Sequence, residues 1–118
     1  MVENNDCIFC KMGRGEIKVP FVAETGNFFA ILDIKPKAAG HMLVIPKKHF
    51  VTLLDLPDNL GNELLGLTKK ISKKLLDEGK GEGFNVVMNN LEAAGQVVKH
   101  AHIHIIPRKK GDGLRSIV

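Results

Sequence analysis

Residues 96–106 read Gln-Val-Val-Lys-His-Ala-His-Ile-His-Ile-Ile, with histidines at every second position: His100, His102 and His104. Successive side chains of a β-strand point to opposite faces of its sheet. The alternation therefore predicts a strand over 97–106 whose three imidazoles share one face. The small and apolar residues between the histidines would then face a hydrophobic core.

An imidazole row on an otherwise apolar strand has three interpretations. Three satisfied surface histidines are the weakest of them, because the strand is apolar and burying histidine without partners costs free energy. The second is a metal site, since imidazole is a common metal ligand. The third is a catalytic row, in which one imidazole is a nucleophile and a neighbour handles protons or oxyanion charge. The residues alone leave the metal and catalytic alternatives open.

Gly95 and Gln96 stand directly before the histidine strand. A glycine lets a ligand approach the main chain closely, and main-chain N–H groups can hold phosphate oxygens. Together with the histidine row, this glycine predicts an anion-binding turn at the start of the strand.

The remaining strands follow from apolar runs that end at turn residues. These runs lie at 28–34, 41–45 and 84–88, with 21–24 as a further candidate and a loop at 89–95. We expect the strand at 41–45 to stop at Pro46 and the histidine strand to stop at Pro107. The connection between the first two runs is short, which favours an antiparallel pair.

One long helix is expected over 57–78. Apolar residues recur there at steps of four, three, four and four, which is typical of one helical face: Leu60, Leu64, Leu67, Ile71 and Leu75. Pro57 suits the first turn and Gly79 the position after the last. Strands, one helix and then strands indicate an α+β fold with an antiparallel sheet.

The composition limits the classes of partner. The chain has 118 residues, a length that fits a single domain over 1–118. Its net charge of +4 favours anionic small molecules as partners. It has six Phe but no Trp or Tyr, so we expect no nucleic-acid partner that needs stacked aromatic rings. The apolar runs are too short to cross a bilayer, and residues 1–6 show no secretory signal. We therefore expect a cytoplasmic protein without membrane association.

Three segments together resemble the histidine-triad (HIT) family. The histidine strand resembles the family signature His-φ-His-φ-His-φ-φ, in which φ is apolar. Residues 32–34 (LDI) and 40–49 (GHMLVIPKKH) resemble its second block, and residues 7–10 (CIFC) its N-terminal block. The three segments follow the family's order and span nearly the whole chain. They are most similar to the Hint-type branch of nucleoside phosphoramidases and to small bacterial or archaeal members.

This resemblance implies a HIT domain over 1–118. Its fold would be α+β, with an antiparallel five-stranded sheet, one long helix and one short helix. The resemblance also implies a homodimer whose two sheets join into one of ten strands.

The implied activity is hydrolysis or transfer at the α-phosphate of a nucleotide. His102 would attack phosphorus to form a covalent nucleotidyl-histidine, and water would then release the nucleoside monophosphate. His104 would hydrogen-bond the phosphate or the scissile atom, and His41 would lie beside the triad on the neighbouring strand. No catalytic metal is expected in this chemistry. The α-phosphate region would be held by Asn89 and by the main chain of Gly95, Gln96 and Val97.

The resemblance also supplies a nucleoside site. Asp33 matches the position that binds the ribose hydroxyls, and a carboxylate can accept from two vicinal hydroxyls. An apolar slot would grip a purine base without fixing which one. Five residues match the base cleft, although ordinary core packing explains each of them nearly as well: Ile8, Phe9, Ile17, Ile31 and Ile34.

Val97 departs from the family pattern, which has Ser or Thr at this position with its hydroxyl near the leaving group. A valine side chain cannot donate a hydrogen bond, although its main-chain N–H is retained. This departure keeps a second function open: a purine-nucleotide-binding regulatory or scaffold protein with weak turnover. The third alternative is a metalloenzyme in which the three histidines bind one zinc.

The cysteines Cys7 and Cys10 form a C-x-x-C pair. With His49 and His100 they would complete a Cys₂His₂ set, the ligand complement of closed structural zinc, as in several bacterial family members. His100 would then be structural, leaving His102 and His104 for chemistry. A redox role for the two cysteines is the alternative.

The expected homodimer would use the helix at 57–78. Its leucines cover more than the single stripe needed to pack on a sheet: Leu64, Leu65, Leu67 and Leu76. Apolar residues left exposed in this way often mark an interface. The alternative is that lysine side chains of the same helix shield them.

Overall fold

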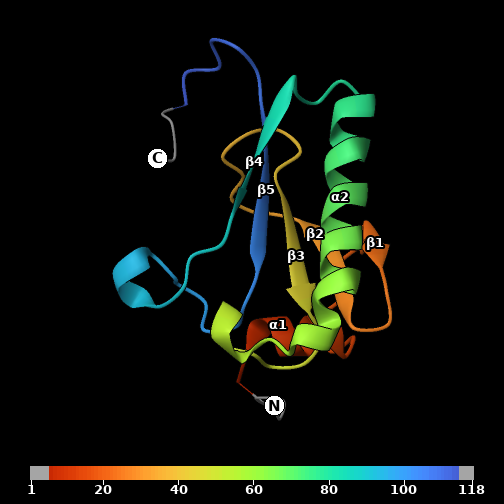
Figure 1. Cartoon of the computed structure of the whole chain (residues 1–118), viewed down its shortest axis with the longest axis vertical. Coiled ribbons are helices and arrows are strands. Elements are labelled where there is room, and N and C mark those ends of the chain that lie inside the picture. Colours follow the sequence, from red (N-terminus) through yellow and green to blue (C-terminus); the bar gives the residue numbers. More distant parts are fainter. Residues whose placement is uncertain (1–5, 115–118) are drawn as a thin grey trace.

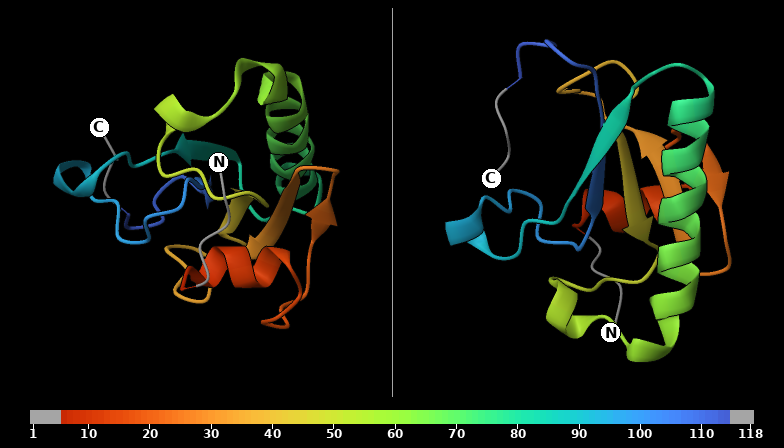
Figure 2. Two further views of the ribbon diagram at one scale, coloured as in Figure 1. Left: turned by 90° about the horizontal axis from the view of Figure 1, so that it is seen from below. Right: turned by 45° about the horizontal axis from the view of Figure 1, so that its top comes forward.

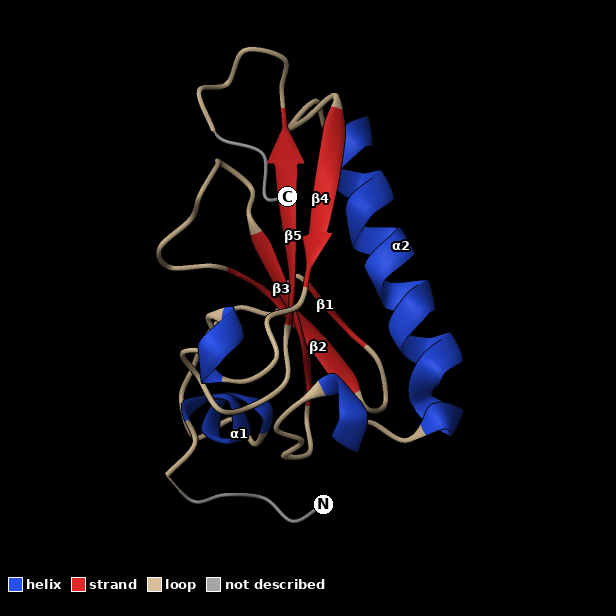
Figure 3. Cartoon of the chain, turned by 60° about the vertical axis from the view of Figure 1, so that its left-hand side comes forward, coloured by secondary structure: helices blue, strands red, loops and turns tan. Residues whose placement is uncertain are grey.

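An antiparallel sheet forms the centre of the protein (Figures 1 and 3). In the computed structural model, which describes residues 6–114, its order is β1-β2-β3-β5-β4. The strands in chain order are β1 (Ala23–Glu24), β2 (Phe28–Leu32), β3 (Met42–Pro46), β4 (Gly83–Val87) and β5 (Ile103–Arg108). With a short helix, α1 (Ile8–Gly13), and a long one, α2 (Gly61–Asp77), they confirm the α+β class and the five strands.

The two helices cover opposite faces of the sheet (Figure 2, left). Residues of β2 and β3 alternate between two apolar clusters, as the pleat of a strand requires. One cluster joins Phe28 and Val44 to Leu67 and Ile71 of α2. The other joins the remaining positions of the same strands, among them Phe29, to α1. The central strands are therefore buried on both sides.

The long helix is shorter than the predicted range 57–78. It begins at Gly61, after a 3₁₀ turn over Asp58–Leu60, and ends at Asp77. Its predicted apolar face does lie on the sheet. Gly79 has a φ of 73°, and its N–H and that of Lys80 bond to carbonyls in the last turn of the helix. This C-terminal arrangement needs the left-handed conformation that glycine adopts readily.

The predicted strand over 97–106 is wrong for its first half, because β5 begins at Ile103. Val44 pairs with Ile103, so Pro46 would lie opposite Ala101 if the ladder continued. Proline has no N–H to donate to the hydrogen-bond ladder between strands. The segment before β5 is held differently, through the Ala101 N–H and the Phe50 carbonyl at 2.6 Å.

Of the two prolines expected to stop strands, Pro46 does end its strand, whereas Pro107 lies inside β5. Pro46 is the last residue of β3, and Pro107 pairs with Phe84 within β5. Pairing between β3 and β5 ends at Ile105, so beyond that point β5 has a neighbour only on its β4 side. The missing N–H of Pro107 therefore costs no bond with β3.

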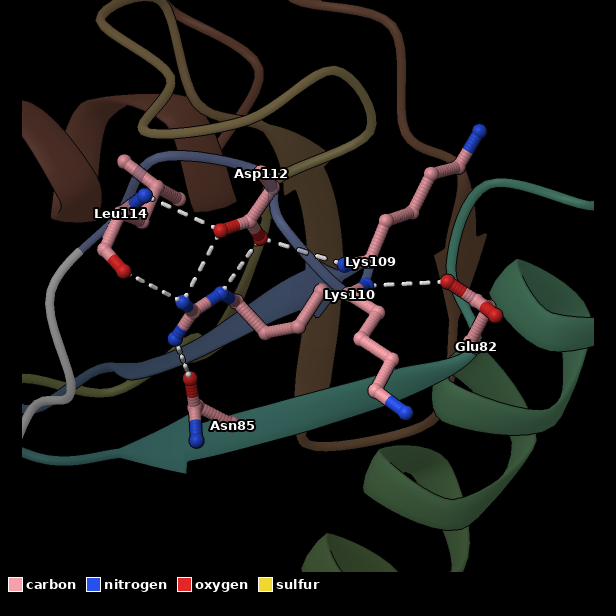
Figure 4. A network of polar contacts seen from close by, with 7 residues as sticks. Glu82, Asn85, Lys109, Lys110, Asp112 and Leu114 are labelled. Atoms are coloured by element: carbon pink, nitrogen blue, oxygen red, sulfur yellow. Dashed lines mark hydrogen bonds and ion pairs between the residues drawn. The ribbon is translucent and has the colours of Figure 1, made fainter.

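The far end of β5 is fixed by Arg108 (Figure 4). Its guanidinium donates to both carboxylate oxygens of Asp112 at 2.8 and 3.1 Å, to the Asn85 side chain and to the Leu114 carbonyl. These bonds hold the pKa of the Asp112 carboxyl well below its usual range and raise the pKa of Arg108. The network ties β4, β5 and the chain beyond β5 together at the end opposite His104.

The start of β3 is fixed by a closed loop. The Asp33 N–H donates to the His41 carbonyl at 2.9 Å, so the chain leaves β2 and re-enters the sheet at one point. Gly40, just before His41, has a φ of 93°. A Cβ at this position would lie 3.2 Å from Leu75 and 3.5 Å from Pro107. Only glycine meets both demands without strain.

No helix among the described residues is long and apolar enough to cross a membrane. The start of the chain, for which we expect no secretory signal, lies outside those residues except for Asp6.

Gly40→Ala should lower the free energy of unfolding by about 1–2 kcal/mol, because alanine strains at positive φ and meets Leu75. Gly66→Ala is the matched control: it lies within α2 with open space around it and should raise stability by about 0.5–1 kcal/mol. Urea denaturation measures both. Equal effects of the two variants would contradict the role assigned to Gly40.

Candidate functional site

The candidate site surrounds the segment that leads into β5. His102 lies there, in edge-to-face contact with Phe9 of α1 at 5.1 Å between ring centroids. Its other neighbour is His104 in β5, at 4.9 Å between ring centroids. The structure therefore brings the last two histidines of the row together, although only His104 lies in a strand.

The protonation of His102 follows from one hydrogen bond. Its Nδ1 lies 2.7 Å from the main-chain carbonyl of His100. A carbonyl only accepts, so Nδ1 must carry a hydrogen and, in a neutral ring, Nε2 is bare. Within residues 6–114, Nε2 has no hydrogen-bond partner, and no unpartnered side-chain nitrogen or oxygen is buried. The bare lone pair is thus open to a ligand.

His104 has the opposite arrangement, which follows from two bonds. The Lys37 N–H donates to His41 Nδ1 at 3.0 Å, so His41 carries its hydrogen on Nε2. That Nε2 lies 3.0 Å from His104 Nδ1 and must donate to it. A neutral His104 then has its own hydrogen on Nε2. The imidazole beside His102 therefore carries an N–H donor on Nε2.

Burial keeps these rings neutral. It lowers the pKa of His41, an effect that the nearby Asp33 carboxylate partly offsets. It also lowers the pKa of His104 to about 4, and the neighbouring imidazoles of His102 and His41 act in the same direction. Near neutral pH, His104 thus donates as an uncharged imidazole.

Asp33 lies beside this pair at the end of β2. One carboxylate oxygen accepts the Lys35 N–H at 2.9 Å, and the other lies 3.5 Å from His41 Nε2. The donor atoms of Asp33, His41 and His104 lie within 4.8 Å of one another, a spacing that also suits a metal. His41, however, accepts a main-chain N–H at one nitrogen and carries its hydrogen on the other. It has no bare nitrogen to offer while that bond is kept.

The loop before the histidines is held by Gln96. Its side-chain oxygen accepts the Leu91 N–H at 2.7 Å, and its side-chain nitrogen donates to the Val51 carbonyl at 2.6 Å. The side chain is buried and used within the protein. Leu91 has a φ of 73°, the only positive value among described non-glycine residues. Such strain persists only where surrounding bonds over-determine the backbone, as these do.

Three predicted phosphate-binding amides differ in availability. The N–H of Gly95 donates to Glu92, and that of Gln96 donates to the Leu91 carbonyl at 3.1 Å. The N–H of Val97 has no protein acceptor within the described part of the chain. The side chain of Val97 is 88% exposed, and Asn89 lies against Gly95. Of these three amides, that of Val97 is therefore the one without a protein acceptor among the described residues.

The five residues predicted for the base cleft divide into two groups. Phe9 and Ile31 are buried in the cluster beneath α1, and Ile17 packs against that cluster. Ile8 is 42% exposed and Ile34 is 83% exposed. The first group serves core packing, and the second offers apolar surface to a ligand.

A second cluster lies at the N-terminal end of α1. Cys7, Cys10, His49 and His100 direct one donor atom each to a common point, all within 4.8 Å of one another. His100 Nδ1 is 3.2 Å from Cys7 Sγ, 3.5 Å from Cys10 Sγ and 3.2 Å from His49 Nδ1. A tetrahedral zinc with bonds of about 2.0–2.3 Å needs donors roughly 3.3–3.8 Å apart, so the set fits.

The orientation of His100 also fits a metal ligand. Its Nε2 lies 2.7 Å from the Pro46 carbonyl and must donate to it, so Nδ1 is bare and faces the two thiols. Burial lowers the pKa of His100 to about 4. His100 therefore belongs with the cysteines, whereas His104 belongs with Asp33 and His41. This division disfavours one zinc shared by all three triad histidines.

Sequence reasoning missed the groups that set these protonation states. They are the Lys37 N–H and the carbonyls of Pro46 and His100. All three are main-chain groups: every residue has the carbonyl, and every residue except proline has the N–H. No residue-type signal could have identified them before the fold was known.

The family resemblance is confirmed by comparison with known proteins. The HIT domain model matches residues 14–111. Over 113 residues the chain is 44% identical to adenosine 5'-monophosphoramidase HNT1 of Candida albicans, covering 92% of this chain and 74% of the relative. It is 42% identical over 110 residues to adenylylsulfatase HINT3 of Arabidopsis thaliana, covering 93% of this chain but 56% of that protein.

A solved structure gives the same result for the fold. The zinc-bound histidine triad family protein from Mycobacterium smegmatis superimposes with a TM-score of 0.87 at 36% sequence identity. The match covers 93% of this chain and 80% of the other.

The depressed pKa of His104 predicts acid sensitivity. Between about pH 6.5 and about pH 4 the unfolded chain binds a proton at His104 that the folded protein refuses. Stability should therefore fall as the pH falls through this window, by at most about 1.4 kcal/mol per pH unit for this group. Urea denaturation across the window should give a shallower slope for His104→Gln. Identical slopes would show that His104 is not held neutral.

Proposed function

The chain belongs to the HIT family and is a HIT-family hydrolase, and from this premise we propose that it acts at the α-phosphate of a nucleotide. Nucleoside phosphoramidates and dinucleoside polyphosphates are the proposed substrates. The observation that carries the proposal is the pair of adjacent imidazoles with opposite protonation. His102 presents a bare nitrogen, and His104 presents an N–H.

In the proposed reaction His102 Nε2 attacks phosphorus, and a P–N bond forms as the bond to the leaving group breaks. The leaving group departs with the bonding electron pair. Water then attacks the same phosphorus, which releases the nucleoside monophosphate and restores the free imidazole. Two easier displacements replace one difficult one. His104 and the Val97 N–H would donate to the phosphate oxygens, where negative charge develops.

Asp33 and the exposed isoleucines would bind the nucleoside. One oxygen of Asp33 is free of main-chain bonds and could accept from both ribose hydroxyls. Ile8 and Ile34 would contact a purine base. The relatives named for an adenosine 5'-monophosphoramidase and an adenylylsulfatase activity support an adenylate as the group transferred.

A purine-nucleotide-binding regulatory or scaffold function with weak turnover is the second candidate, because Val97 supplies no hydroxyl at its exposed position in the loop before the histidines. Incubation with an adenosine phosphoramidate separates the two. Rapid release of AMP supports hydrolysis as the main function, and binding with only weak turnover supports the regulator.

We also propose that Cys7, Cys10, His49 and His100 hold one structural zinc. The donor set has the composition and spacing of a closed zinc site, and a zinc-bound relative shares the fold. The ion would fasten α1 to the segment that carries His102, a useful staple in a chain of 118 residues.

A homodimer is proposed through α2 and β4. Leu65 and Leu76 are 59% and 37% exposed, and with Phe84 and Val86 they line a groove of about 630 Å³. β4 is an edge of the sheet, so its outer main-chain groups are free to pair. Pairing of two β4 strands would cover this surface and produce the expected ten-stranded sheet.

His102→Ala should abolish turnover of an adenosine phosphoramidate, because no bare imidazole nitrogen then faces phosphorus. Mass spectrometry after rapid quenching should detect a nucleotidyl adduct on the wild-type peptide containing His102 and none on the variant. Lys99→Ala, an exposed neighbour, is the control and should retain activity. Wild-type turnover by His102→Ala would refute the proposed nucleophile.

Elemental analysis of protein purified without chelator should find one zinc per chain. Cys7→Ala should lose the zinc, because only three of the four protein ligands that a structural zinc needs would remain. His104→Gln leaves all four donors in place and should retain the metal. Absence of zinc from the wild type, or its retention in Cys7→Ala, would contradict the assignment.

Leu65→Asp should shift the protein toward monomer in sedimentation experiments at micromolar concentration, because a charge would be buried in the proposed interface. Leu54→Asp is the matched control, since Leu54 is exposed but outside the groove. A wild-type protein that sediments as a monomer would refute the dimer.

A further inference from the structure

The loop between β2 and β3 delivers one main-chain N–H to the candidate site. The Lys37 N–H points at His41 Nδ1 at 3.0 Å, within a loop held at several points. The Asp33 N–H bonds the His41 carbonyl at 2.9 Å, and the His41 N–H bonds the Ala38 carbonyl at 3.0 Å. Asp33 also accepts the Lys35 N–H. The position of the Lys37 amide is therefore fixed by the loop itself.

This bond has a direction that cannot be reversed. An amide N–H donates and never accepts, so the nitrogen of His41 that faces it must be bare. A doubly protonated His41 would lose the bond. Its buried position, 2% exposed, also disfavours the charged ring. The hydrogen of His41 is thus confined to Nε2.

The position of the hydrogen on His41 then determines the tautomer of His104. His41 Nε2 and His104 Nδ1 are 3.0 Å apart, and only one of them can carry the hydrogen between them. Because His41 supplies it, Nδ1 of His104 is the acceptor and the hydrogen of His104 lies on Nε2. Within residues 6–114 that Nε2 has no protein partner, and it is open to a ligand.

We propose that the main-chain amide of Lys37, acting through His41, fixes the tautomer of His104 and so makes His104 a hydrogen-bond donor to the substrate phosphate. Lys37 and His41 are positioning residues in this scheme, because neither needs to touch the substrate. The inference rests on the proposed function only in that a phosphate is the group His104 faces.

The consequence concerns transition-state stabilisation. With the other tautomer, His104 would turn a lone pair toward the phosphate oxygens and repel them. A preorganised donor of this kind contributes roughly 10²–10³-fold to kcat in enzymes that stabilise oxyanions. We call the hydrogen bonds from the Lys37 amide through His41 to His104 the relay. Loss of the relay should therefore lower kcat more than it raises KM.

Two matched pairs of variants test the relay. Lys37→Pro removes the N–H and Lys37→Ala keeps it, while both lose the same side-chain charge. His41→Gln retains an acceptor for Lys37 and a donor for His104, whereas His41→Leu retains neither. The second pair leaves the main chain unaltered, so it decides the question if Lys37→Pro does not fold.

The first measurement needs no substrate. Long-range ¹H–¹⁵N correlation spectra at neutral pH show which ring nitrogen of His104 carries hydrogen. We expect hydrogen only on Nε2 in the wild type, Lys37→Ala and His41→Gln. We expect a detectable Nδ1–H population in Lys37→Pro and His41→Leu. A pure Nε2–H form of His104 in both disrupted variants would overturn the inference.

The second measurement is steady-state hydrolysis of an adenosine phosphoramidate. We expect kcat of His41→Leu to fall at least tenfold below that of His41→Gln, with KM within about threefold. Lys37→Pro should fall below Lys37→Ala in the same way. Equal kcat within each pair would overturn the inference. If the wild type forms no adduct on His102, the proposed function fails instead, and the spectra alone decide the relay.

Discussion

The site depends on the fixed polarity of three main-chain groups. The carbonyl of His100 can only accept, and so can that of Pro46, whereas the amide of Lys37 can only donate. Each of them meets an imidazole nitrogen at 3.0 Å or less. Histidine is otherwise ambiguous, because either nitrogen can carry the hydrogen. The fold removes this ambiguity at four histidines, since His104 receives its assignment through His41.

His100 links the cysteine cluster to the imidazoles of the candidate site. His100 directs its bare nitrogen toward Cys7 and Cys10, while its carbonyl holds His102. Phe9 of α1, which lies between Cys7 and Cys10 in the sequence, is in edge-to-face contact with both imidazoles. A zinc bound in the proposed site would thus fasten both the helix and the segment that position the nucleophile. Its contribution would be mechanical, with His102 and His104 left for chemistry.

Much of this arrangement could be predicted from the sequence. Side-chain spacing predicted the face of α2 and the proximity of His102 and His104, and the family resemblance predicted that His49 and His100 meet the cysteines. The start of β5 could not be predicted, because it depends on the register that would place Pro46 opposite Ala101. The two bonds of the Gln96 side chain, one to Leu91 in its own loop and one to Val51, were also unforeseen. The Gln96–Val51 bond and the register of Pro46 involve residues far apart in the chain, which leave no periodic pattern in the sequence.

The most direct measurement of the central claim is neutron diffraction from a deuterated crystal of the protein at neutral pH. It locates the exchangeable deuterium on each imidazole without reference to activity. The account predicts deuterium on Nδ1 of His102, on Nε2 of His41 and on Nε2 of His104, with Nε2 of His102 bare. Deuterium on Nε2 of His102, or on Nδ1 of His104, would contradict it, because the nucleophile and the donor would then be absent from the site as described.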